Sequence, residues 1–290
     1  MAAVLLALGT SASYGVANLL GPLLARRHPL AAVLLVGQGA ALVLAVGGLL
    51  VSGEPAPGSH ALLIGLVAGV GNAVGLITFL LAAERGPVSL VAPIGATGGA
   101  LPVIYDVAGG ASLSTVEVAG LACALTGVIL ASRRSAPEAG AVAESAAVIA
   151  GRARDLRACV LLSLSSALGF GTLLIALPRA SRDGRWWALA DARAVIVLGV
   201  LAFAVLARRS LRAPLQATPV LAVPGLLLLT GTLVYTLAAE RGSLSLVAVL
   251  ASLNPAVTVT LAFVVLHERL SRVQTAGILL TVAGVALIAS

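Results

Sequence analysis

Charged and aromatic residues are scarce in this chain of 290 residues. Only 10% of the residues are charged and 3% are aromatic, and lysine is absent, so all 18 basic residues are arginines. A soluble domain carries roughly 25% charged residues, and this chain has too few to cover a globular surface. The scarcity excludes a soluble enzyme, a disordered protein and a fibrous repeat.

Motifs for covalent, metal or nucleotide chemistry are also lacking. The sequence has no P-loop, no Gly-x-Ser-x-Gly elbow, no glycine-rich dinucleotide fingerprint and no cluster of His, Cys and Asp. Cys123 and Cys159 lie in or beside apolar segments without a CxxC spacing, which is typical of packed, inert thiols. We therefore expect no enzyme activity, no catalytic residues, no metal site and no cofactor.

Long apolar runs fill most of the chain. Hydrophobic residues make up 60% of it and the mean hydropathy is +1.10, and a membrane helix needs about 20 mostly apolar residues. Turn and charge signals divide the runs into ten segments, which predict an all-α, polytopic membrane protein with ten transmembrane helices. The expected spans are 3–24, 29–52, 60–82, 88–108, 115–132, 158–178, 186–207, 219–239, 243–265 and 272–289.

The net charge of +7 comes from arginines that lie mostly in the gaps between apolar runs. This placement is typical of topology control in membrane proteins, so no nucleic-acid partner is expected. Thirteen arginines follow odd-numbered spans and four follow even-numbered spans. Because arginine-rich loops stay in the cytoplasm, the bias predicts that both termini lie outside the cell.

The chain contains an internal repeat. Residues 81–92 and 237–248 agree at ten of twelve positions, and the agreement includes the charged hexapeptide Leu-Ala-Ala-Glu-Arg-Gly. The offset of 156 residues between these copies falls to 154 near the start of the chain and rises to 157 near its end. Weaker matches are Gly15 with Gly169, Leu19-Leu20 with Leu173-Leu174, Gly120 with Gly277, and Gly127-Val128 with Gly284-Val285.

The repeat divides the chain into two units. We assign residues 1–134 to the first five-helix unit, 135–156 to a polar linker and 157–290 to the second unit. Five is an odd number, so the second unit inserts the opposite way up. The result is an inverted repeat with a two-fold axis in the membrane plane. Small residues on the fifth and tenth spans predict that these two helices pack together.

The end of the chain is similar to a known family. Ser252-Leu253-Asn254-Pro255 is followed by His267-Glu268-Arg269-Leu270-Ser271 and by Gly277. With the duplicated hexapeptide, this order resembles the EamA-type repeats of the drug/metabolite transporter superfamily. The first half departs from the pattern at Gly110-Ala111-Ser112-Leu113, where Glu-Arg-Leu is missing. The resemblance implies a ten-helix, gradient-coupled or exchanging carrier of small metabolites with both termini inside the cell, opposite to the arginine bias.

Arg193 is the most informative polar residue within the spans. Residues 194–207 supply only 14 apolar positions, fewer than the roughly 20 that a span needs, so the seventh span must include it. Its repeat mate, at an offset of 155, is Gln38. Two interpretations remain open: an interfacial arginine beside tryptophan anchors, and a cavity arginine that binds a carboxylate or phosphate.

Other isolated polar side chains complete the candidate site. Hydrogen bonding between helices is the alternative role for each of them. Asp106, at the end of the fourth span, is a candidate coupling carboxylate, and a helix-end acid at the interface is its alternative. His267 and Glu268 are expected to cap the last span, and Asn254-Pro255 to interrupt the ninth. The substrate-cavity candidates are Tyr14, Asn18, Gln38, Asn72, Arg193, Thr232, Tyr235 and Asn254.

The sequence favours a secondary transporter in the plasma membrane. It would move a small, amino-acid-like or drug-like metabolite by alternating access, with export favoured over import. The alternative is a non-transporting membrane scaffold or regulator that has retained a transporter fold. The expected partners are the small-molecule substrate, the lipid bilayer and coupling protons, and both a monomer and a homodimer are compatible with the sequence.

Overall fold

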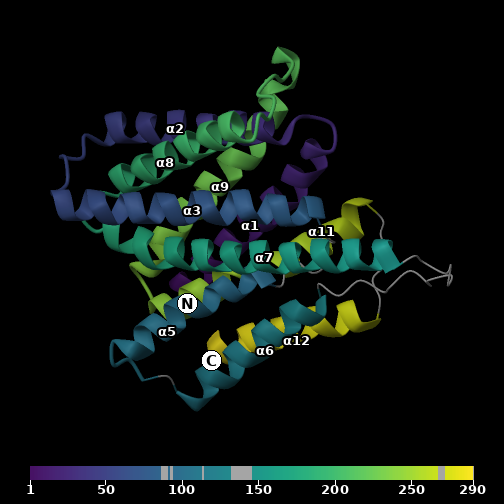
Figure 1. Ribbon diagram of the computed structural model, residues 1–290. Helices are drawn as coiled ribbons and strands as arrows, with labels where there is room; N and C mark the ends of the chain where they lie inside the picture. The colour runs from purple at the N-terminus through teal and green to yellow at the C-terminus, as the bar shows by residue number, and fades with distance from the viewer. Residues whose placement is uncertain (86–90, 92–93, 113, 132–145, 267–271, 290) are drawn as a thin grey trace.

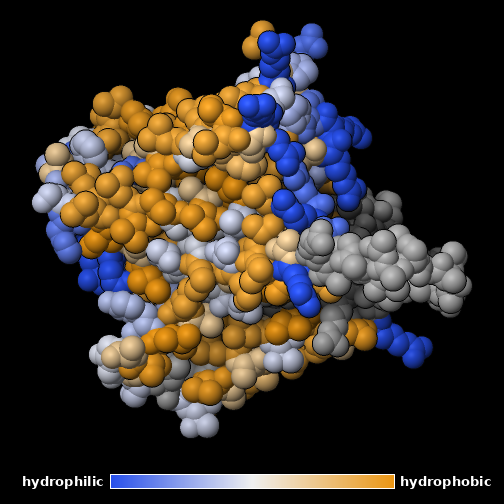
Figure 2. All heavy atoms as spheres, viewed as in Figure 1, coloured by the Kyte–Doolittle hydropathy of each residue, from blue (hydrophilic) through white to orange (hydrophobic). Residues whose placement is uncertain are grey.

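The computed structural model describes residues 1–85, 91, 94–112, 114–131, 146–266 and 272–289. Within these residues the regular structure is helical and no strand is present. An apolar chain in a bilayer must hydrogen-bond its own main chain, which a helix does within one segment. Figure 1 shows α2, α3, α7 and α8 running nearly parallel across the molecule. Figure 2 shows an apolar band between hydrophilic ends.

Helices of the first half precede residue 132 and those of the second half follow residue 145. The first half contains α1 (Ala2–Ala25), α2 (Leu30–Ser52), α3 (Ser59–Arg85), η1 (Thr97–Gly99), α5 (Ala100–Ala108) and α6 (Thr115–Ala131). The second contains α7 (Ala146–Ala180), α8 (Arg185–Leu206), η2 (Leu215–Ala217), α9 (Thr218–Ala239), α10 (Leu244–Ala251), α11 (Asn254–Leu266) and α12 (Arg272–Ala289).

Six described segments are long and apolar enough to cross a membrane. They belong to α1, α2, α3, α7 and α8, and to α9 together with η2. Shorter apolar helices cover Ile94–Ala108, Val118–Gly127 and Leu244–Thr258. The prediction of an all-α, multi-pass membrane protein is confirmed.

Two helix boundaries differ from simple apolar runs. Helix α7 begins at Ala146, inside the stretch 135–156 predicted as a linker, because alanine and arginine are strong helix formers even where the sequence is polar. The ninth span is interrupted, as predicted: α10 ends at Ala251 and α11 begins at Asn254. Pro255 explains the break, since it lacks an amide proton and clashes with the preceding turn.

Contacts between the halves dominate the packing. Helix α3 lies along α7, α1 along α9, α2 against both α8 and α9, and α3 also against α8. Helices α6 and α12 form a separate pair at one edge of the molecule in Figure 1. A Cβ atom at Gly284 would lie 2.5 Å from the amide nitrogen of Ala124, so the predicted packing of the fifth and tenth spans is confirmed.

The helix ends define two faces. At one face α1, α3 and α8 end and α2 and α9 begin; at the opposite face α2 and α9 end and α3 and α8 begin. We call the first one the arginine-rich face. Its described loops and helix ends hold Arg26, Arg27, Arg85, Arg208, Arg209 and Arg212.

Two ion pairs mark the opposite ends of α8. Arg209, just beyond its end, pairs with Glu84 of α3 at 2.9 Å. Arg185, its first residue, pairs with Glu240, which follows α9. Helix α8 has 22 residues and therefore extends roughly 33 Å. Glu84 and Glu240 occupy the same position in the two copies of the hexapeptide, so the two copies lie at opposite faces.

Candidate functional site

A pocket lies among α1, α2, α3 and α9. Its empty volume is about 480 Å³, part of which continues to the outside. The lining residues come from the end of α1, the first part of α2, the last part of α3 and the first half of α9. The pocket is therefore on the side of the arginine-rich face. Asn18 and Gln38 are polar, and every other lining residue is apolar or glycine.

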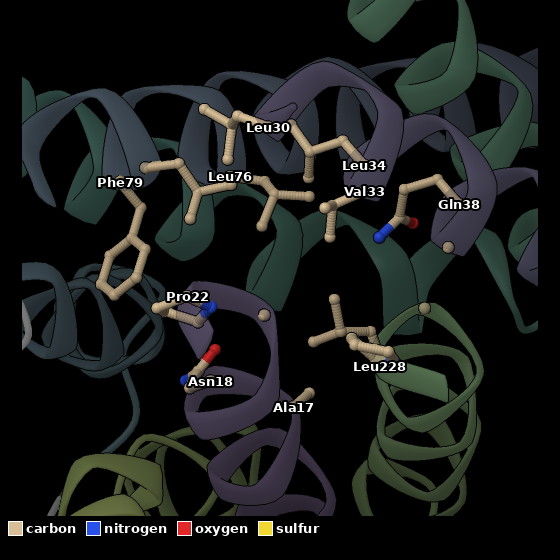
Figure 3. A pocket seen from close by; sticks show the side chains of 15 residues that line it. Ala17, Asn18, Pro22, Leu30, Val33, Leu34, Gln38, Leu76, Phe79 and Leu228 are labelled. Atoms are coloured by element: carbon tan, nitrogen blue, oxygen red, sulfur yellow. The ribbon is translucent and has the colours of Figure 1, made fainter. Parts of the chain in front are cut away.

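Asn18 and Gln38 present complementary groups to this pocket. The amide nitrogen of Asn18 donates to Oδ1 of Asn254 at 2.9 Å, and the side-chain oxygen of Gln38 accepts from Nη1 of Arg193 at 2.8 Å. In Figure 3 the free oxygen of Asn18 and the free nitrogen of Gln38 point toward the pocket. The pocket thus offers one hydrogen-bond acceptor and one donor within an apolar wall.

Arg193 lies behind Gln38 and is only 2% exposed. Its Nη2 donates to the carbonyl oxygen of Leu228 at 2.9 Å and to the hydroxyl of Thr232 at 2.7 Å. These bonds and the one to Gln38 join α8 to α2 and α9. No carboxylate among the described residues forms an ion pair with Arg193. The hydrogen-bond acceptors of its guanidinium in this part of the chain are all neutral.

Two tyrosines lie deeper in the same interior. The hydroxyl of Tyr14 is buried without a hydrogen-bond partner among the described residues, and its ring lies against Gly231. The hydroxyl of Tyr235 donates to the carbonyl oxygen of Leu174 at 2.7 Å. Asn72 of α3 is 7% exposed.

The structure divides the eight cavity candidates into three groups. Asn18 and Gln38 line the pocket. Asn254 holds Asn18 and donates to the carbonyl oxygen of Ala251 across the α10–α11 break. The remaining five do not line the pocket and lie in the protein interior: Tyr14, Asn72, Arg193, Thr232 and Tyr235.

Asp106 lies at the opposite face. Its Oδ2 accepts hydrogen bonds from the amide of Ser245 at 2.9 Å and from the hydroxyl of Ser245 at 2.6 Å. A carboxylate at the first turn of α10 is stabilised by free amides and by the helix dipole. Asp106 therefore ties α5 to α10; its coupling role stays a prediction. His267 and Glu268 lie outside the described residues.

Sequence reasoning passed over one acid in the spans. Asp191 is two residues from Arg193 and points elsewhere, toward α3. One of its carboxylate oxygens contacts the backbone at Gly65 and is buried without a partner among the described residues. The spacing of two residues places it off the face of Arg193, and nothing in the sequence indicates the contact with α3.

Comparisons with known proteins bear on the fold and the family. Residues 157–290 match the model of the EamA-like transporter family. No curated protein matches the sequence. Twenty-three chains of solved structures match the fold. One of them, titled "Crystal structure of protein", is 17% identical, with a TM-score of 0.76 over 98% of this chain and 94% of that chain.

Proposed function

Because residues 157–290 match the EamA-like transporter family, we propose that the chain is a secondary transporter of small molecules. That match supports the resemblance to EamA-type drug/metabolite transporters in the second half, and the resemblance of the first half stays a prediction. The pocket beside the Gln38–Arg193 pair is the observation that carries the proposal, because it gives a substrate a place to bind between the halves. The plasma membrane is the proposed location.

The contacts support two inverted five-helix halves. By the repeat, α1 corresponds to α7, α2 to α8, α3 to α9 and α6 to α12. Exchanging each helix for its counterpart turns the α1–α9 contact into the α7–α3 contact and leaves the α2–α8 and α6–α12 contacts unchanged. The repeat mates Gln38 and Arg193 touch each other, as residues beside a two-fold axis do. The repeated residues Glu84 and Glu240 lie at opposite ends of α8, as inversion requires. Ten membrane spans follow if the shorter apolar helices also cross the membrane.

A pocket on one side supports alternating access. Contacts near the opposite face hold the helices together there: Asp106 bonds Ser245, and the guanidinium of Arg179 lies 4.1 Å from the ring centre of Tyr105. These contacts join α5 to α10 and to α7. The transport cycle would break them while the pocket closes at the arginine-rich face.

The pocket wall supports a small, amphipathic substrate. Apart from Asn18 and Gln38, its walls are apolar residues and glycines, and one donor and one acceptor fix the orientation of a polar group. The arginine bias assigns the arginine-rich face to the cytoplasm. A substrate that binds there would load from the cytoplasm, so we propose export.

Filling the pocket is expected to block transport. Gly21 lines the pocket, and a Cβ there would meet no atom within 4 Å. A phenylalanine at this position would enter the space that the substrate needs. In proteoliposomes loaded with a radiolabelled metabolite pool, Gly21→Phe should lower counterflow at least about tenfold, which corresponds to about 1.4 kcal/mol.

Gly39→Phe is the matched control. Gly39 does not line the pocket, and its Cβ would also meet no atom within 4 Å. Equal flux losses in both variants would mean that the pocket is not the transport site. If the unmodified protein catalyses no counterflow of any metabolite in the pool, the transporter hypothesis is refuted and the non-transporting scaffold remains.

A further inference from the structure

We infer that Arg193 and four other buried polar residues of α3 and α9 form the second half of the transport site, which opens toward the opposite face and binds an anionic group of the substrate. The inference rests on the proposed function and on its inverted repeat. We call these residues the Arg193 cluster: Asn72, Arg193, Thr232, Tyr235 and Thr236.

The repeat relates this cluster to the pocket. When two inverted halves exchange conformations, residues that line the site from one face are replaced by their mates, which line it from the other. The offset is 156 residues beside the hexapeptide and 155 at Gln38. Five of the pairs join the pocket lining to polar residues: Leu76 with Thr232, Phe79 with Tyr235, Leu80 with Thr236, Leu228 with Asn72, and Gln38 with Arg193.

The directions of the helices agree with this relation. Leu76, Phe79 and Leu80 lie in the second half of α3, which ends at the arginine-rich face. Their mates lie in the second half of α9, which ends at Ala239 near the opposite face. A site lined by the mates would therefore open to the opposite face.

The two halves of the site differ in chemistry. Three apolar pocket residues of α3 are matched by two threonines and a tyrosine on α9, and Leu228 is matched by Asn72. The neutral amide of Gln38 is matched by a guanidinium, whose planar donors suit carboxylate and phosphate. A site with one fixed positive charge and several hydroxyl and amide donors favours an acceptor-rich anion.

The charge of Arg193 has no acidic partner within the described part of the chain. Arg193 is 2% exposed and, within the described part of the chain, has only neutral acceptors. The hydroxyl of Tyr14 is also buried without an acceptor among the described residues. Charged residues inside a membrane protein mark substrate and ion pathways. A carboxylate or phosphate bound at Arg193 would pair with its charge.

Labelling of single cysteines tests the two-sided site. In a full-length background with Cys123→Ala and Cys159→Ala, Leu80→Cys and Thr236→Cys are compared in membrane vesicles of both orientations. The probe is a membrane-impermeant methanethiosulfonate. Exposed markers are Ser210→Cys at the arginine-rich face and Asp183→Cys at the opposite face.

Leu80→Cys should react when the reagent is added on the side of the membrane from which Ser210→Cys reacts. Thr236→Cys should react when it is added on the side from which Asp183→Cys reacts. Reaction of both from one side, or no reaction of Thr236→Cys from the side of Asp183→Cys, overturns the inference. Thr232→Cys is a second reporter and should repeat the result. The labelling experiment does not depend on transport. If the two cysteines react from opposite sides but the protein catalyses no counterflow, the proposed transport function is refuted and the two-sided site is not.

Protection from labelling tests the anion. Benzoate and phenyl phosphate differ in their anionic group, and benzamide is the neutral control. At least one anion should slow labelling of Thr236→Cys at least about tenfold, and which of them does so separates a carboxylate from a phosphate site. The protection should vanish with Arg193→Gln. Protection by neither anion, equal protection by benzamide, or protection that survives Arg193→Gln overturns the anionic assignment.

Discussion

Replacement of Gly225 by valine is expected to prevent the chain from reaching its native fold. Gly225 of α9 crosses Gly37 of α2 with the two backbones in contact, and a Cβ at Gly225 would collide with the carbonyl group of Gly37. Small residues at such crossings allow membrane helices to approach closely. The colliding group is backbone, so no rotamer change relieves it. We expect a loss of at least about 3 kcal/mol, the upper end of the usual cost of overpacking.

The mate of this crossing provides a second test. Gly69 lies 156 residues before Gly225 and is its repeat mate. A Cβ atom added at Gly69 would lie 3.0 Å from the Cα atom of Ala192 on α8. Gly69→Val should therefore also destabilise the fold. Gly47→Val is the control, because a Cβ there would meet no atom within 4 Å. The yield of monodisperse protein in detergent and the thermal unfolding midpoint measure the effect. Equal midpoints for Gly225→Val and Gly47→Val would contradict the close crossing.

Much of the fold follows from the sequence because the membrane restricts the alternatives. Apolar runs in a bilayer must be helical, so the runs between charged turns predict most helix bounds to within a few residues. Pro255 predicts the break between α10 and α11. The early start of α7 at Ala146 was missed, because a polar, alanine-rich stretch is compatible with both a linker and a helix.

The site was harder to predict than the helices. Arg193 and Gln38 stand out in the sequence because each is polar within an apolar run. Their offset indicates that they are repeat mates, but it does not indicate that they touch. Leu76 and Phe79 line the pocket, and their residue types fit equally well in the core or against lipid. Asp191 was set aside because it lies two residues from Arg193 and off its helical face. Its approach to Gly65 joins two helices that are distant in sequence, which the sequence does not indicate.

Arg193→Gln and Arg193→Lys are both expected to abolish transport. Glutamine keeps a hydrogen-bonding side chain but removes the charge. Lysine keeps the charge, yet a point ammonium cannot reproduce the fork that bonds Gln38, Thr232 and the carbonyl of Leu228 together. Loss of one partner of a buried, hydrogen-bonded charge costs about 2–5 kcal/mol. Initial counterflow rates should therefore fall about 30-fold or more in both variants.

The measurement must separate chemistry from folding. Arg193 joins α8 to α2 and α9, so each variant is first compared with the unmodified protein by its thermal midpoint and its monodisperse fraction. Arg241→Gln is the matched control, because Arg241 lies exposed just beyond the end of α9 and donates to the carbonyl oxygen of Leu237 in the last turn of that helix. Lost counterflow in both Arg193 variants with a retained fold would support an anion-binding guanidinium. If both folded variants transport normally, Arg193 serves only to join the helices, and the substrate need not be an anion.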